Sequence, residues 1–212
     1  TVDSESGALG LPKDDPPKTG KGPAAVALDP VGRFSFVANA RDDSVSVFTH
    51  RRIFSAAMYP INGEGSAFPA GDNPVSLSVD PTGKFLKVAN KDSVNVSVFT
   101  IHYHGGQLTT VKDSPFASGQ APVSLAIHPG GQFVYVINAD SADIVTYKID
   151  PVTGELDVLP QRVAAGKQPE SIVLGPEGRV AYVRNKATNV LRKYKVEAIC
   201  CQLTFAAEID FG

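Results

Sequence analysis

The stretch Asn73–Phe99 reads "NPVSLSVDPTGKFLKVANKDSVNVSVF", and it contains three short apolar runs separated by two turn signals. Pro81 and Gly83 form the first signal, because proline fixes φ and glycine accepts a positive φ. Asn90 opens the second, where short polar side chains can hydrogen-bond to the backbone. Apolar residues alternate in the runs, as expected for strands with one side buried. The stretch therefore predicts three consecutive antiparallel strands.

This pattern occurs four times without gaps. The copies begin at Pro23, Pro74, Pro122 and Pro169, so their starts are 51, 48 and 47 residues apart. Each copy also keeps a second proline, a glycine, an asparagine and a closing aromatic residue at fixed offsets. These anchors are Pro30, Pro81, Pro129 and Pro176; Gly32, Gly83, Gly131 and Gly178; Asn39, Asn90, Asn138 and Asn185; and Phe48, Phe99, Tyr147 and Tyr194. Segments between the copies, such as "TGELDVLPQRVAAG" after Val152, supply a fourth and more polar strand.

Repeated four-stranded units of about 45 residues are typical of β-propeller blades. A blade cannot bury both of its faces alone, so neighbouring blades must supply the core. We predict an all-β protein, a single β-propeller array over residues 1–212, with four antiparallel four-stranded blades. The predicted blades are 23–72, 73–120, 121–167 and 168–212, and residues 1–22 are the end of a preceding blade. Both chain ends supply a fourth-type strand, which favours part of a larger ring over a closed four-bladed ring.

Composition excludes several functional classes. The 20 basic and 22 acidic residues nearly balance, which gives no reason to expect nucleic acid as a partner. No apolar run reaches the roughly 18 residues that a membrane span needs. The two cysteines, Cys200 and Cys201, are adjacent, and they are interpreted as free thiols or, alternatively, as an intermolecular bridge.

With these anchors, the chain resembles the lactonase-like family of YVTN-repeat β-propellers. The matching residues are "FVYVINADSADIVTYKIDPVTGEL" from Phe133 and "SPFASGQAPVSLAIHP" from Ser114. The resemblance implies a seven-bladed ring and a considerably longer chain. Some members of the family hydrolyse 6-phosphogluconolactone or related lactones, and many bacterial members look like secreted or cell-surface repeat proteins. The resemblance therefore favours a periplasmic or secreted protein, with the cytoplasm as the alternative.

The resemblance also implies a motif for catalysis, G-x-x-P-R-H-x-x-x-H-P followed by N-E in the same blade. In that motif the arginine would hold an anionic substrate, and the histidine and glutamate would serve proton transfer. This chain has Ala24–Ala25, Val75–Ser76, Val123–Ser124 and Glu170–Ser171 at the Arg-His pair, and Ala40, Lys91, Ala139 and Lys186 after the asparagine. No blade keeps the set, so no catalytic residue is predicted. A non-catalytic binding scaffold is the favoured function; a lactone hydrolase, or a fragment of one, is the alternative.

The variable positions of the repeat are the candidate binding site, because the resemblance places them at one mouth of the central channel. The predicted ligand-binding residues are Glu170, Ser171, Lys186, Arg184, Lys91, Ser76 and Ser124. A polar mouth suits a protein or polymer ligand, or a small sugar lactone. Glu170 and Lys186 belong to one blade and can face each other, and the simpler interpretation is an exposed ion pair.

Four further features have simple interpretations. His102 and His104 can form half of a metal site, but a solvated loop pair explains them better, so no metal or cofactor is predicted. His128 is interpreted as a turn residue. Lys87 stands where other copies have an aromatic residue, and it is expected to extend its ammonium group to solvent at a blade edge. Exposed blade edges suggest self-association.

Overall fold

The computed structural model describes residues 18–50, 58–61, 67–197 and 201–210, which form four antiparallel sheets joined by turns. The first sheet contains β1 (Pro23–Leu28), β2 (Phe34–Asn39), β3 (Ser44–His50), β4 (Met58–Pro60) and β5 (Ala67–Pro69). The second contains β6 (Pro74–Val79), β7 (Phe85–Asn90), β8 (Asn95–Ile101), β9 (Leu108–Thr110) and β10 (Phe116–Ala117). The third contains β11 (Pro122–Ile127), β12 (Phe133–Asn138), β13 (Asp143–Ile149) and β14 (Leu156–Ala164). The fourth contains β15 (Pro169–Leu174), β16 (Val180–Asn185), β17 (Val190–Val196) and β18 (Leu203–Asp210).

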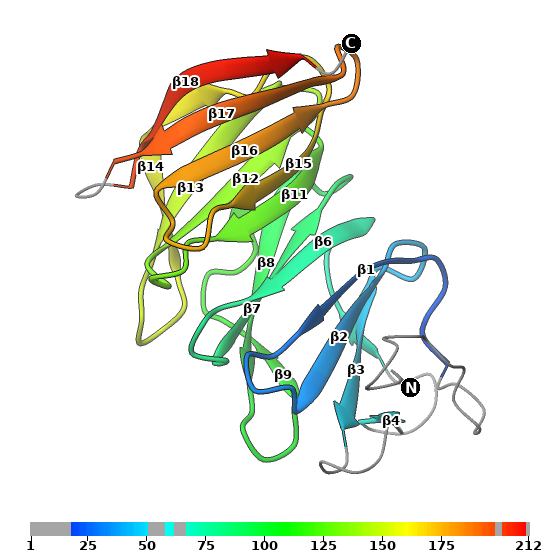
Figure 1. Ribbon diagram of the computed structural model, residues 1–212. Coiled ribbons are helices and arrows are strands. Elements are labelled where there is room, and N and C mark those ends of the chain that lie inside the picture. Colours follow the sequence, from blue (N-terminus) through cyan, green and yellow to red (C-terminus); the bar gives the residue numbers. More distant parts are fainter. Residues whose placement is uncertain (1–17, 51–57, 62–66, 198–200, 211–212) are drawn as a thin grey trace, which may run out of the picture.

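The sheets follow one another along an arc, as Figure 1 shows, and each uses its strands in chain order from the inner strand outward. The outer position is split into two short strands in the first two sheets, where β4 and β5 both pair with β3, and β9 and β10 both pair with β8. The prediction of an all-β propeller with four-stranded antiparallel blades is confirmed. β1 and β15 lie at opposite ends of the arc, so the described residues form an open array and not a closed four-bladed ring.

In the first two sheets, a buried aspartate closes the Pro-x-Gly turn. In the second sheet, Asp80 is buried, and one of its carboxylate oxygens accepts hydrogen bonds from the backbone N–H of Lys84 at 3.0 Å and of Phe85 at 2.6 Å. Gly83 has a φ of 71°, a conformation that favours glycine. His128 occupies the position of Asp80 in the third sheet, where its Nδ1 accepts from the N–H of Gly130 at 3.0 Å, as expected for a turn residue.

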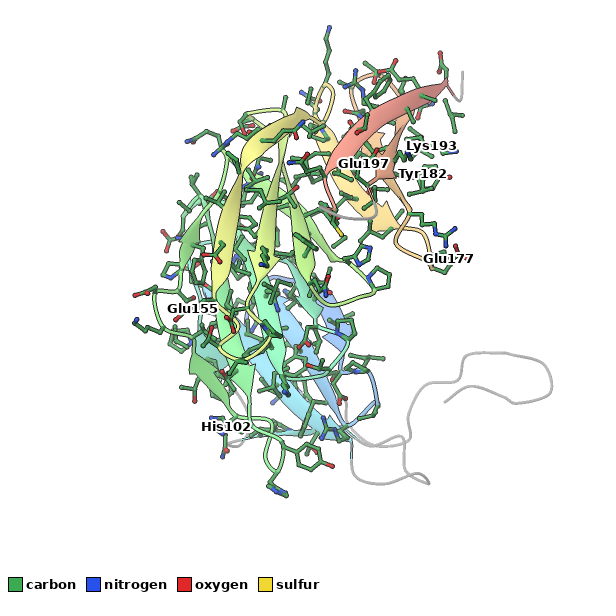
Figure 2. The ribbon with its side chains drawn as sticks, turned by 90° about the vertical axis from the view of Figure 1, so that its left-hand side faces the viewer. His102, Glu155, Glu177, Tyr182, Lys193 and Glu197 are labelled. Atoms are coloured by element: carbon green, nitrogen blue, oxygen red, sulfur yellow. The ribbon has the colours of Figure 1, made fainter. Side chains whose placement is uncertain are left out.

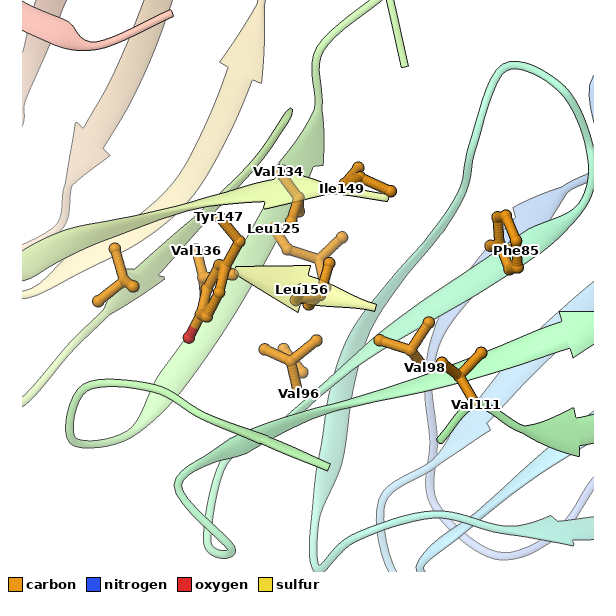
Figure 3. Close-up of a cluster of buried hydrophobic side chains, with 12 residues drawn as sticks. Phe85, Val96, Val98, Val111, Leu125, Val134, Val136, Tyr147, Ile149 and Leu156 are labelled. Atoms are coloured by element: carbon orange, nitrogen blue, oxygen red, sulfur yellow. The ribbon is translucent and has the colours of Figure 1, made fainter. Parts of the chain in front are cut away.

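Apolar faces of neighbouring sheets form the core. Between the second and third sheets, Phe85, Val96 and Val98 on one side meet Val134 and Tyr147 on the other, and Figure 3 shows this cluster. Equivalent clusters lie between the first and second sheets and between the third and fourth. Burial of these faces is the largest favourable contribution to folding, since the hydrophobic effect scales with the apolar area removed from water.

Hydroxyl groups also connect the inner strands directly. Ser76 Oγ of β6 accepts a hydrogen bond from the N–H of Leu125 in β11 at 3.2 Å. One sheet further on, Ser124 Oγ of β11 accepts from the N–H of Ile172 in β15 at 3.3 Å. Ser171 has the same repeat position in β15, and its hydroxyl has no hydrogen-bond partner within the described ranges. The serines therefore satisfy backbone donors that face away from their own sheets.

A buried asparagine ends each second strand, and a glycine lies against it. Asn90 is fully buried, and its Nδ2 donates to Asn95 Oδ1 and to Ser97 Oγ, both at 2.8 Å. A Cβ added to Gly71 would lie 2.8 Å from Asn90 Cγ, which is closer than real contacts allow. Gly20, Gly119 and Gly166 approach the other three asparagines in the same way. This glycine, three residues before the first proline, is an anchor that the sequence analysis missed.

The prediction for Lys87 was wrong. The side chain does not reach solvent: Lys87 exposes 0 % of its surface and lies in the central strand β7. It points to the same side of β7 as Phe85 and Ala89, which contact the third sheet. Because side chains alternate between the two faces of β7, Lys87 is directed into the interface with the third sheet, where its ammonium group cannot reach solvent.

The serine links give a direct test of the inner-strand contacts. We expect Ser124→Ala to lower the free energy of unfolding by about 1 kcal/mol, because the N–H of Ile172 loses its partner. Ser171→Ala is the matched control and should leave stability unchanged. Urea unfolding of the 212-residue chain measures both, and equal losses in the two variants would contradict this role.

The glycine–asparagine contact gives a second test. We expect Gly71→Ala to destabilise the fold by about 1–3 kcal/mol, because the new Cβ would force Asn90 out of its hydrogen bonds. Gly175→Ala is the control, since its added Cβ would meet only Val180 O at 3.7 Å. Thermal unfolding followed by circular dichroism should show a lower melting temperature for Gly71→Ala alone. Unchanged melting in both variants would refute the close contact.

Candidate functional site

The charged candidates gather on the last sheet. Glu170 and Ser171 lie at the start of β15, and Arg184 lies at the end of the neighbouring strand β16, where it is the register partner of Ser171. Arg184 Nη1 and Glu170 Oε2 are 3.1 Å apart, with 59 % and 43 % of the two side chains exposed. Lys186 is exposed and forms no ion pair within the described ranges. Glu170 therefore pairs with Arg184, and the expected facing pair of Glu170 and Lys186 is not found.

The other candidates are spread along the array. Ser76 and Ser124 lie one sheet apart on inner strands, and both hydroxyls accept the interblade hydrogen bonds described above. Lys91 follows β7 and is half-buried, while Lys186 follows β16, so the whole third sheet separates these two lysines. The structure thus brings together Glu170, Ser171 and Arg184, and it does not bring Lys91 to them.

The outer face of the last sheet presents polar groups where the equivalent face of the third sheet is apolar. Figure 2 shows Tyr182 and Lys193 on the side of this sheet that no other described sheet covers. The equivalent residues of the third sheet, Tyr135 and Thr146, are buried at 0 % and 3 % exposure. Arg184 stands where the third sheet has the buried Ile137. This open polar face adjoins the Glu170–Arg184 pair.

Tyrosine hydroxyls form hydrogen bonds between neighbouring sheets. The repeat pattern alone identified Tyr147 and Tyr194 only as aromatic residues at a fixed position. Tyr147 donates to the backbone oxygen of Ala117 in the second sheet at 2.6 Å, and Tyr194 donates to that of Ala164 in the third at 2.7 Å. Burial raises the pKa of both phenols.

Tyr135 bonds to the following sheet and not to the preceding one: its hydroxyl donates to the backbone oxygen of Cys201 at 2.7 Å. Cys201 is buried and adopts a φ of 50°, in the left-handed region that favours glycine.

A partly buried ion pair lies beside the asparagine of the third sheet. Arg162 Nη1 and Asp143 Oδ2 are 2.7 Å apart, and only 15 % of the Asp143 side chain is exposed. Burial alone would raise the pKa of Asp143, but hydrogen bonds from Arg162, Ser141 and Asn138 outweigh it and lower that pKa. The carboxylate is therefore held in its charged form as a structural acceptor.

A pocket of about 740 Å³ lies at the opposite end of the sheets from the candidate mouth. Its lining includes Asp80 and Phe85 from the second sheet, Gly131 and Ile149 from the third, and Gln202 from the fourth. These residues belong to the Pro-x-Gly turns and the neighbouring strand ends. The pocket was not predicted, since it depends on how turns from three different blades meet.

The two loop histidines take separate partners. His102 Nε2 lies 2.7 Å from Thr109 Oγ1, and the ring of His104 packs edge-on against Tyr103 with centroids 5.1 Å apart. Tyr103 also lies over the guanidinium of Arg33 at 4.3 Å, which connects this loop to the first sheet. Within the described ranges, no group of three or more His, Cys, Asp or Glu residues could hold a metal ion.

Comparison with known families identifies the scaffold. The family model "Lactonase, 7-bladed beta-propeller" matches residues 9–123 and 101–170. The chain belongs to this lactonase family. The expected resemblance is confirmed, and it rests on more than half of the chain. No curated protein matches the chain, and none of the described residues form a helix long and apolar enough to cross a membrane.

Solved structures agree with this membership at the level of the fold. A putative 6-phosphogluconolactonase from Bacteroides fragilis is similar with a TM-score of 0.78 and 22% identity, covering 89% of this chain and 55% of that one. The periplasmic gluconolactonase of Pseudomonas aeruginosa has a TM-score of 0.73 and 23% identity, covering 90% and 54%. A putative 6-phosphogluconolactonase from Bacteroides uniformis has a TM-score of 0.77 and 19% identity, covering 87% and 54%. The chain spans about half the length of these lactonase-family structures.

The Glu170–Arg184 pair is exposed, so it should contribute little to stability. We expect a double-mutant cycle with Glu170→Ala and Arg184→Ala to give a coupling energy of at most about 1 kcal/mol. The matched cycle with Asp143→Ala and Arg162→Ala should give a larger coupling, because the Asp143 side chain is only 15 % exposed, against 43 % for Glu170. Urea unfolding at pH 7 measures both cycles. A stronger coupling for the exposed pair would show that it is a structural contact and not a surface free to bind a ligand.

Proposed function

We propose that this lactonase-family array is a non-catalytic scaffold that binds a protein or polymer at the mouth formed by its inner strands. The main support for the proposal is that two serines at the mouth hold neighbouring sheets together. Ser76 and Ser124, which stand where the family motif implied by the resemblance has a proton-transferring histidine, hold the N–H groups of Leu125 and Ile172. A hydroxyl engaged in the scaffold does not provide a general base.

The charge pattern supports the same proposal. Glu170 stands where the family motif implies an arginine, and Lys186 stands where it implies a glutamate. An anionic substrate would therefore meet a carboxylate in place of its expected cation. The exposed Glu170 and Arg184, with the partly exposed Lys193, instead offer both signs of charge over an open face, a pattern that suits an extended polar ligand. We place the protein in the periplasm or outside the cell, supported by the likeness to a periplasmic gluconolactonase.

Lactone hydrolysis is the second candidate, and family membership favours it. Two of the similar structures are described as putative 6-phosphogluconolactonases and one as a gluconolactonase. In this alternative, a small sugar lactone binds at the mouth, and Arg184 polarises its carbonyl oxygen while Glu170 assists proton transfer. The chain would then be a carboxylic-ester hydrolase or a part of one.

An assay of glucono-δ-lactone hydrolysis, monitored by the release of protons, distinguishes the two candidate functions. We expect the chain to give no turnover above the spontaneous rate, and Glu170→Ala to change nothing. Glu177→Ala is the matched control, because Glu177 is an exposed glutamate in the turn at the other end of the same sheet (Figure 2). Turnover that Glu170→Ala abolishes and Glu177→Ala preserves would overturn the binding-scaffold proposal in favour of the hydrolase.

A further inference from the structure

Lys87 is a buried ammonium group inside an otherwise apolar interface. It exposes 0 % of its surface, and its Nζ has no hydrogen-bond partner within the described ranges. The nearest aromatic group is Phe85, whose ring centroid is 5.3 Å from Nζ. A cation over an aromatic face recovers only part of the cost of removing a charge from water. The buried lysine in the middle of β7 therefore lowers the free energy of unfolding.

The repeat shows what this position holds elsewhere. The equivalent residues in the other sheets are Phe36, Tyr135 and Tyr182. Tyr135 reaches across to the next sheet and donates its hydroxyl to the backbone oxygen of Cys201. In the third sheet, Gly154 has the repeat position of Cys201, so the turn around Gly154 is the equivalent target for Lys87. A lysine is shorter than a tyrosine from Cβ to its polar atom, and the corresponding bond is not made.

Few charged groups face Lys87. On its own sheet, Asp80 lies in the turn after β6 and favours the charged ammonium. On the facing sheet, Tyr147 is the titratable member of the cluster, and its hydroxyl donates to Ala117. The other cluster residues from β8, β11, β12, β13 and β14 are apolar. His128 sits in the third-sheet turn, but its ring lies against Gly178 of the fourth sheet. Burial lowers the pKa of Lys87 from 10.5 to about 8, and Asp80 offsets only part of this effect.

We propose that Lys87 makes the contact between the second and third sheets the pH-sensitive joint of the array. When the ammonium is protonated, the joint carries an unpaired buried charge and opens more readily than the other two joints. When the amine is neutral, the joint closes as a normal apolar interface. The 740 Å³ pocket borders this end of the interface, since Asp80, Phe85 and Ile149 line it.

The sign of the pH dependence follows from linkage. The folded state binds the Lys87 proton more weakly than the unfolded state, whose pKa is near the ordinary 10.5. Below about pH 8 the amine is charged in both states and the full cost applies. Between about pH 8 and 10.5 the folded state loses its proton first, so stability rises with pH. The two pKa values differ by 2.5, which corresponds to a change of about 300-fold in the folding equilibrium constant.

Urea unfolding from pH 7 to 10.5 tests the proposal, with Lys87→Met and Lys87→Tyr as variants. Both variants should be more stable than the wild type at pH 7, since each removes the buried charge. The ratio of the wild-type folding constant to that of Lys87→Met should rise about 150-fold across this range, since about half of the unfolded amines are still protonated at pH 10.5. Parallel pH profiles for wild type and Lys87→Met would overturn the proposal, and so would a failure of both variants to fold.

Hydrogen exchange resolves where the effect acts. After correction for the intrinsic pH dependence of exchange, amides in β7 and β8 of the wild type should gain protection between pH 7 and 9.5. Amides in β16 and β17 should not, because none of the described residues in their interface with the third sheet is a buried lysine. Lys87→Tyr should remove the difference between the two sheets. Equal gains in both sheets of the wild type would contradict a joint located at Lys87.

Discussion

Apolar packing of each sheet against its neighbours is the constraint on which the rest of the structure depends. Every residue of β7 and β12 is buried, because these strands belong to the second and third sheets, each of which packs between two other described sheets. β16 has the same place in the last sheet, yet it alternates between buried and partly exposed residues, and Arg184 in it is exposed. Its one covered face is apolar and its other face carries polar side chains. Burial thus follows the neighbours of a strand and not its place in the repeat.

This constraint also limits what the inner strands can do chemically. The mouth of a propeller is built from the strands that must connect one blade to the next. In this chain, Ser76 and Ser124 provide those connections, so two of the predicted ligand residues belong to the scaffold. Glu170 and Arg184 remain available at the end of the array, paired with each other and exposed to solvent. The scaffold belongs to the lactonase family, while its mouth carries side chains other than the Arg, His and Glu of the motif that the resemblance implies.

The repeat made the fold predictable, because turns and alternation are local signals. The predicted strands after Pro74, within "FVYVIN" and around Val96 are all present. Contacts between blades were not predictable, since their partners lie far apart in the sequence: Tyr135 bonds to Cys201, 66 residues away. Lys87 was misplaced for the same reason, because its surroundings depend on a neighbouring sheet. At the mouth, the ion-pair partner of Glu170 is Arg184 and not Lys186. Residue offsets alone do not predict which of these two side chains reaches the carboxylate.

The central claim is that blades are stable only against each other. The most direct measurement compares the thermal unfolding of a peptide spanning residues 121–167, the predicted third blade, with that of the whole chain by circular dichroism. We predict a cooperative transition for the whole chain and none for the peptide, since both faces of the isolated sheet would meet water. A cooperative transition in the isolated peptide, at a melting temperature near that of the whole chain, would contradict the claim.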